Sequence, residues 1–80
     1  MNTEFYKQLL AIKREREIST RQLAKECNIC YGTLVKFFNP DKEFTPIRDV
    51  TKARLNNRLG ISYEVMDEYN KEIEKMKVGN

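Results

Sequence analysis

The two cysteines are the residues whose spacing first suggests chemistry. Cys27 and Cys30 form a Cys-x-x-Cys spacing, which occurs in redox-active and zinc-binding proteins. A structural zinc ion takes four ligands, whereas this chain has two cysteines and no histidine. The redox motif belongs after a β-strand, and the sequence predicts no strand here. We therefore interpret both cysteines as reduced, small apolar side chains, and we expect no metal and no other cofactor.

Other catalytic patterns are missing from the sequence. It has no histidine, no pair of carboxylates spaced for acid–base catalysis and no glycine-rich phosphate loop. We therefore expect a protein that is not an enzyme and that binds no small-molecule ligand.

Charge is unevenly distributed along the 80 residues, which have a net charge of +3. Residues 1–60 contain 12 lysines and arginines against 7 acidic residues, whereas residues 61–80 contain 3 against 5. A basic body suits a polyanion such as DNA. Many domains without such a partner have a similar excess, so charge alone does not decide the function.

The length fits one domain over residues 1–80. A chain of this size buries only about 60% of its unfolded surface, which leaves a narrow margin of stability. No apolar run approaches the ~18 residues of a membrane span, and the N-terminus lacks a basic segment followed by an apolar stretch. We expect a cytoplasmic protein with no membrane partner.

Helix signals dominate, because no segment alternates apolar and polar residues over five or more positions. The expected fold is all-α. The first helix is predicted to begin after Asn2 or Thr3, with its buried stripe at Phe5, Leu9 and Ile12.

Residues 20–39 have the pattern of a helix-turn-helix. Ser19 and Gln22 form a predicted capping box, and Asn28 tolerates the left-handed conformation that separates two helices. Ala24 supplies the small residue that two steeply crossing helices need where they touch. The second of these helices is expected over residues 31–38, and its apolar positions and those of its partner are Leu23, Cys27, Ile29, Leu34 and Phe37.

A polar turn is predicted over residues 39–45, with Phe44 anchoring it to the body. Thr45 and Pro46 are interpreted as the N-cap and first residue of a fourth helix that ends at Gly60. The expected buried stripe of that helix is formed by Ile47, Val50, Leu55 and Leu59.

The last helix is predicted over residues 62–77, with Ser62 as its cap and a hydrophobic staple between Ile61 and Met66. Its apolar seam repeats with 3-4-3 spacing over nearly two heptads. This seam either packs back onto the first helix or forms a dimer contact, and the sequence leaves both open. The seam consists of Met66, Tyr69, Ile73 and Met76.

Taken together, these segments resemble the Cro and phage-repressor class of helix-turn-helix proteins over about residues 9–66. Three positions depart from that class: Asn28 replaces the usual turn glycine, Gly32 stands where a polar side chain is common, and Lys52 stands where an apolar one is usual. The resemblance is carried by residues 18–26, Ile29, Thr33 and Leu34, with Leu9, Ile12 and Lys13 before them and residues 59–62 after them.

The resemblance implies a five-helix lambda-repressor-like domain with a longer C-terminal helix. It also implies a sequence-specific, repressor-like regulator of transcription that places its recognition helix in the major groove of double-stranded DNA. A phage, a mobile element or a bacterial chromosome would be its setting. The implied base contacts are Tyr31, Gly32, Thr33, Val35 and Lys36, and the implied phosphate contacts are Thr20, Arg21, Gln22, Asn39 and Lys42.

One such module contacts only half an operator, so we expect a homodimer on a palindromic site. The seam from Met66 to Met76 is the candidate interface. An alternative is a protein-binding module on the same scaffold, such as an antitoxin, antirepressor or adaptor, that docks through its last helix.

Overall fold

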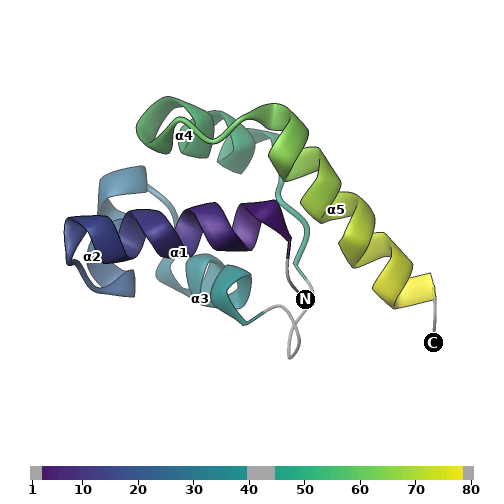
Figure 1. Cartoon of the computed structure of the whole chain (residues 1–80), viewed down its shortest axis with the longest axis horizontal. Helices are drawn as coiled ribbons and strands as arrows, with labels where there is room; N and C mark the ends of the chain where they lie inside the picture. The colour runs from purple at the N-terminus through teal and green to yellow at the C-terminus, as the bar shows by residue number, and fades with distance from the viewer. Residues whose placement is uncertain (1–2, 40–44, 79–80) are drawn as a thin grey trace.

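A computed structural model of the chain describes residues 3–39 and 45–78, with side chains described up to Lys75. Within these ranges the protein is all-helical, as predicted, and contains no strand (Figure 1). No helix among the described residues combines the length and the apolar character needed to cross a membrane. The five helices are α1 (Glu4–Arg16), α2 (Thr20–Cys27), α3 (Tyr31–Phe38), α4 (Asp49–Leu59) and α5 (Tyr63–Val78).

Local hydrogen bonds set most helix ends where the sequence predicts them. The Thr3 hydroxyl accepts the Tyr6 backbone N–H at 3.3 Å, and the Ser19 hydroxyl accepts the Gln22 N–H at 3.1 Å, which is the first of the two capping-box bonds. Asn28 ends α2 with φ 57°, and Gly60 ends α4 with φ 73°. The predicted caps at Ser19, Asn28 and Gly60 are therefore confirmed.

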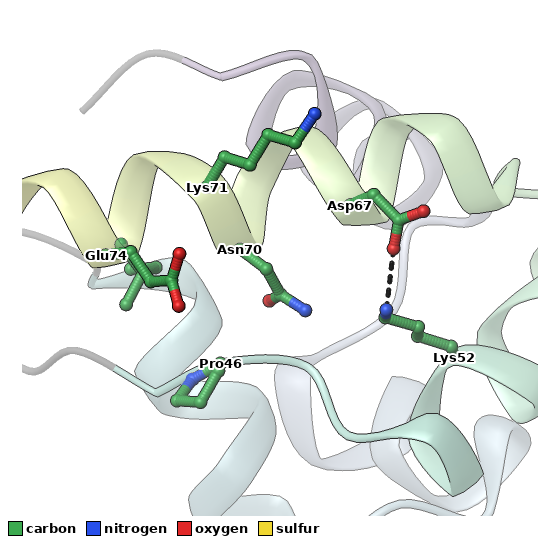
Figure 2. Close-up of a pocket in the computed structure, with 7 residues that line it drawn as sticks. Pro46, Lys52, Asp67, Asn70, Lys71 and Glu74 are labelled. Carbon is green, nitrogen blue, oxygen red and sulfur yellow. Dashed lines mark hydrogen bonds and ion pairs between the residues drawn. The ribbon is translucent and has the colours of Figure 1, made fainter.

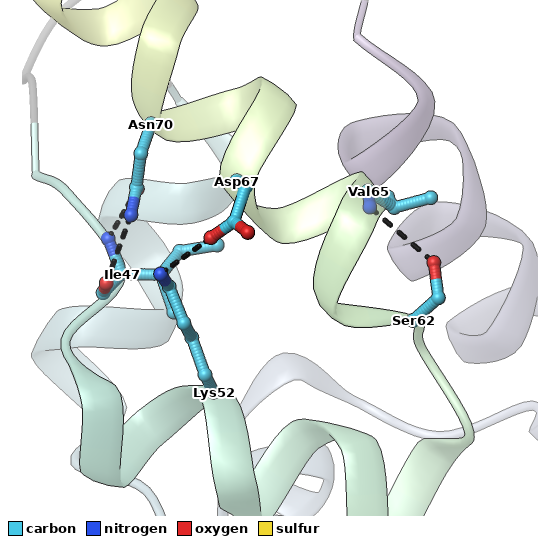
Figure 3. Close-up of polar contacts among 6 residues, drawn as sticks. All are labelled: Ile47, Lys52, Ser62, Val65, Asp67 and Asn70. Carbon is cyan, nitrogen blue, oxygen red and sulfur yellow. Dashed lines mark hydrogen bonds and ion pairs between the residues drawn. The ribbon is translucent and has the colours of Figure 1, made fainter.

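The predicted start of α4 is wrong. Thr45 and Pro46 lie before the helix, which begins at Asp49 with Arg48 as its N-cap. The cause is a pair of hydrogen bonds to α5: the Ile47 N–H donates to Asn70 Oδ1 at 2.7 Å, and Asn70 Nδ2 donates to the Ile47 carbonyl at 3.0 Å (Figure 3). In a helix that began at Pro46, the Ile47 carbonyl would accept a backbone N–H one turn further on, whereas here it accepts from Asn70.

The late start of α4 also changes which of its residues are buried. Leu55 is fully buried, as expected, and Leu59 is partly buried. Ile47 is buried from the segment before the helix. Val50 is 61% exposed, so its place in the predicted buried stripe is wrong.

Lys52, which departs from the resembled pattern, connects α4 to α5. Its Nζ donates to Asp67 Oδ1 at 2.6 Å, and its own side chain is only 15% exposed (Figure 3). The hydrogen bond to Asp67 raises the pKa of the Lys52 amine. Because Asp67 is exposed to solvent, such a pair contributes about 0 to 1 kcal/mol. A polar contact thus stands where the resembled class usually has an apolar one.

Three aromatic rings join α1, α3 and α5 in the core. Phe5 lies 5.5 Å from Phe37 and 4.8 Å from Tyr69, and Phe37 lies 6.0 Å from Tyr69, all between ring centroids. Two of the three pairs are edge-to-face, an arrangement favoured by the ring quadrupoles. The hydroxyl of Tyr69 is buried without a hydrogen-bond partner in the described part of the chain.

The apolar seam of α5 is part of this core. Met66, Tyr69 and Ile73 are all buried within the single chain, where α5 packs against α1 and α4. The prediction that these three side chains form a dimer interface is therefore wrong, because a chain this short needs them for its own core. The side chain of Met76 lies outside the described residues.

We predict that Tyr69→Phe raises the free energy of unfolding by about 1 kcal/mol at pH 7, because it removes a buried hydroxyl that lacks a partner. Burial raises the pKa of Tyr69 from 10.0 to about 12. Tyr69 ionises near pH 10 in the unfolded chain but only near pH 12 in the folded protein. The unaltered protein therefore loses stability as the pH rises from 10 to 12, whereas the variant does not, so the advantage of the variant should widen over this range. Denaturant unfolding of both proteins across this range measures it. An equal stability at every pH would contradict the expectation.

Candidate nucleic-acid interface

The packing of α2 on α3 determines which side chains of α3 reach the surface. Leu34 and Phe37 of α3 are fully buried, and so are Leu23 and Cys27 of α2. Ala24 is buried at 3% exposure, and Ile29 in the turn is packed against the same core. The other side of α3 therefore faces outward.

This outward side carries most of the implied base-contacting residues. Tyr31, Gly32 and Lys36 are exposed, whereas Thr33 and Val35 are partly buried. Hydrogen-bonding side chains thus reach solvent at Tyr31, in the first turn of α3, and at Lys36, in its second turn. Of the base-contacting residues expected to make apolar contacts, Val35 is less exposed than Tyr31, and it is adjacent to the core residue Leu34.

The implied phosphate-contacting residues are less uniform. Arg21 and Gln22 are exposed in the first turn of α2, and Thr20 is partly buried. Asn39 is exposed, but its Nδ2 donates to the Val35 carbonyl at 3.0 Å and so caps the end of α3. Lys42 lies outside the described residues.

Arg21 contacts α3 directly. Its guanidinium carbon lies over the Tyr31 ring, 4.4 Å from the centroid. A cation over an aromatic face at an exposed site contributes about 0.5 to 1 kcal/mol. The contact brings a residue of the phosphate-contacting set against a residue of the base-contacting set.

A basic hollow of about 320 Å³ lies beside the outward side of α3. It is bounded by α3, the segment before α4 and α4 itself. Among the described residues, three cations and three threonines line it, and no acidic residue does. The lining consists of Ile29, Cys30, Thr33, Lys36, Thr45, Pro46, Arg48, Thr51 and Arg54.

Two of these cations were not anticipated from the sequence. Arg48 and Arg54 belong to a region whose helix start was predicted three residues too early. Their place in the hollow depends on where α4 begins and on what holds it against α3. The excess of lysine and arginine before residue 60 was the only signal in the sequence that pointed to them.

Hydrogen bonds to distant parts of the chain position Arg54 and the residue that precedes Arg48. Arg54 Nη1 donates to the Asn28 carbonyl at 2.9 Å, at the C-terminal end of α2, where a positive charge interacts favourably with the helix dipole. This bond connects α4 to the turn before α3. Arg48 directly follows Ile47, whose backbone is held by Asn70.

A second hollow, between the segment before α4 and α5, differs in charge. It measures about 450 Å³, and both cations and carboxylates line it (Figure 2). Lys52 and Asp67 bind each other across it, and Asn70 is engaged by Ile47. These central polar groups already have partners within the chain, so we assign no ligand to this hollow.

The two cysteines lie in opposite environments. Cys27 is buried, and burial raises the pKa of its thiol. Cys30 is exposed at the N-cap of α3, where the backbone amides of Thr33 and Gly32 lower the pKa of its thiol. Both are free thiols. In the described part of the chain, no group of three or more histidine, cysteine or acidic residues is placed to hold a metal ion.

Comparison with protein-family models, with curated proteins and with solved structures found no match for this chain. The functional assignment therefore depends on the geometry of α2, α3 and the basic hollow.

We predict that Asn70→Ala lowers the free energy of unfolding by about 2 kcal/mol, because it leaves two backbone groups of the buried Ile47 without partners. Denaturant unfolding measures the change. Lys71→Ala, which truncates the exposed neighbour on the same helix, serves as the control and should change stability by less than about 0.5 kcal/mol. Equal losses in the two variants would show that the Asn70 bonds do not hold the segment.

We also predict that Gly32→Ala raises the free energy of unfolding by up to about 1 kcal/mol, the difference in helix propensity. An added Cβ would meet only Cys30 Sγ, at 3.9 Å. The matched variant Gly60→Ala should instead be destabilising, because Gly60 has φ +73°. Thermal unfolding compares them, and a destabilised Gly32→Ala protein would mean that α3 does not tolerate a side chain there.

Proposed function

We propose that this protein is a sequence-specific double-stranded DNA-binding regulator of transcription. In this proposal α2 and α3 form the helix-turn-helix of a lambda-repressor-like domain, and α3 is the recognition helix. The observation that carries the proposal is the basic hollow beside α3, where Lys36, Arg48 and Arg54 converge and the described lining residues include no acidic one.

The dimensions of α3 suit the major groove. An α-helix with its side chains is about 10 to 12 Å in diameter, and the major groove is about 12 Å wide, so the outward side of α3 can enter it. Tyr31, Thr33 and Lys36 would face the base edges, with Lys36 a donor to guanine and Thr33 able to donate or accept. Gly32 would allow the backbone of α3 to approach the duplex closely.

A helix in the major groove has a phosphate backbone on each side, and α3 has cations on each side. On the α4 side, Arg48 and Arg54 would bind phosphate oxygens, assisted by the threonine hydroxyls of the hollow, with Lys36 between them and the bases. On the α2 side, Lys25 and the backbone amides at the start of α2 would bind the other strand.

A homodimer remains part of this proposal, because one recognition helix contacts only a half-site. The buried seam of α5 is not its interface, so the second copy would contact another surface. The alternative function, a protein-binding module that docks through its last helix, is less well supported, because the apolar side chains of that helix at Met66, Tyr69 and Ile73 already pack in the core.

Selection of bound sequences from random duplexes tests the proposal and should yield a palindromic consensus. On that consensus, we predict that Lys36→Ala and Arg48→Ala each weaken binding about tenfold or more. The slope of log affinity against log salt should become shallower by about 0.9 for each phosphate that the protein no longer neutralises. Fluorescence anisotropy at several salt concentrations measures both quantities.

The matched control is Lys75→Ala, which removes the same charge from α5, where the side chain is 74% exposed. It should bind within about twofold of the unaltered protein, because long-range effects of one exposed charge are screened by salt. Binding that does not depend on salt, or an equal loss in all three variants, would contradict the proposal.

A further inference from the structure

Arg21 has an unusual neighbourhood for an exposed arginine near the start of a helix. In the described ranges it forms no ion pair, and it contacts the face of the Tyr31 ring, 4.4 Å from the guanidinium carbon. Both residues also border a hollow beside the turn between α2 and α3. The positive charge of Arg21 is thus held in place without being neutralised.

An arginine over an aromatic ring keeps its hydrogen-bonding capacity. Its five N–H donors spread in a fixed fork around the guanidinium carbon, so a single ring beside that carbon cannot occupy all of them. The ring also restricts the long side chain before any ligand arrives, which reduces the conformational entropy lost on binding. The Arg21 guanidinium is therefore preorganised to bind two hydrogen-bond acceptors that lie in one plane.

The position of Tyr31 indicates where those donors lie. Tyr31 is the first residue of α3, and the N-terminal residues of a recognition helix are the ones that contact base edges. Arg21 is brought to this end of α3 by the ring, although it belongs to α2. A phosphate contact needs no such placement, because phosphates are reached from the flanks of the helix.

We propose that Arg21 is a specificity-determining residue that binds O6 and N7 of one guanine in each half-site, and that Tyr31 is its positioning residue. This rests on the proposed function and reassigns Arg21 from phosphate contact to base contact. The planar acceptor pair on the major-groove edge of guanine is the chemistry that the guanidinium fork recognises. Lysine is a poor replacement, because its ammonium group is a point charge without a fork.

The test is to repeat the selection from random duplexes with four variants of the full chain. Arg21→Lys should lose a roughly tenfold to hundredfold preference for guanine at one position of the half-site and keep the preferences elsewhere. Tyr31→Ala should lose the same guanine preference, together with any preference that the Tyr31 ring itself confers. Tyr31→Phe retains the ring and should retain that guanine. Lys25→Ala, which removes an exposed cation from the same helix, should weaken all sequences alike.

The outcomes separate this inference from the proposed function. Uniform weakening in Arg21→Lys, with every base preference retained, would overturn the inference and return Arg21 to a phosphate. A Tyr31→Ala protein that keeps the guanine preference would overturn the role of Tyr31. Circular dichroism of each exposed-residue variant checks that the helices are intact. If the unaltered protein selects no sequence at all, the proposed function itself fails.

Discussion

The contact of Phe37 with Phe5 and Tyr69 fixes the rotation of α3, and the proposed interface depends on that rotation. A helix of two turns has few residues with which to set its orientation, and Phe37 and Leu34 are the fully buried ones here. With these two inward, the positions that remain outward carry the hydrogen-bonding side chains. Rotation of α3 by one residue would bury polar groups and expose a large aromatic ring, both of which cost free energy.

The outward side of α3 borders a basic surface only because α4 begins at Asp49. Asn70 of α5 holds Ile47, and Arg54 of α4 holds the turn at Asn28, so the segment between these contacts is fixed at both ends. Arg48 is consequently beside α3 rather than inside an extended α4. Hydrogen bonds and packing therefore connect the cations of the hollow to the segment before α4 and to the core, although these parts are distant in sequence.

Features that depend on residues close together in the sequence were predicted correctly, whereas features that depend on distant residues were not. The caps at Ser19, Asn28 and Gly60 were predicted correctly because they depend on residues within one turn of the helix end. The start of α4 was predicted wrongly because it depends on Asn70, which is 23 residues away. The same nonlocal contact explains the exposure of Val50 and the failure to anticipate Arg48. The pattern of α5 identified its apolar seam, but it carried no information on whether that seam meets α1 or a second copy.

The use of the α5 seam in the core affects how such a protein would bind DNA. A chain that buries its longest apolar stripe internally retains few large apolar side chains for a second copy, and Tyr31, Val50 and Tyr63 are the exposed ones among its described residues. Weak association between copies would place more of the binding free energy on contacts with DNA itself. In the proposed function those contacts would be predominantly cationic, and cationic contacts gain their free energy from the release of counterions. Affinity would then respond strongly to ionic strength, while selectivity would depend on the few side chains at the first turn of α3, where Arg21 and Tyr31 meet.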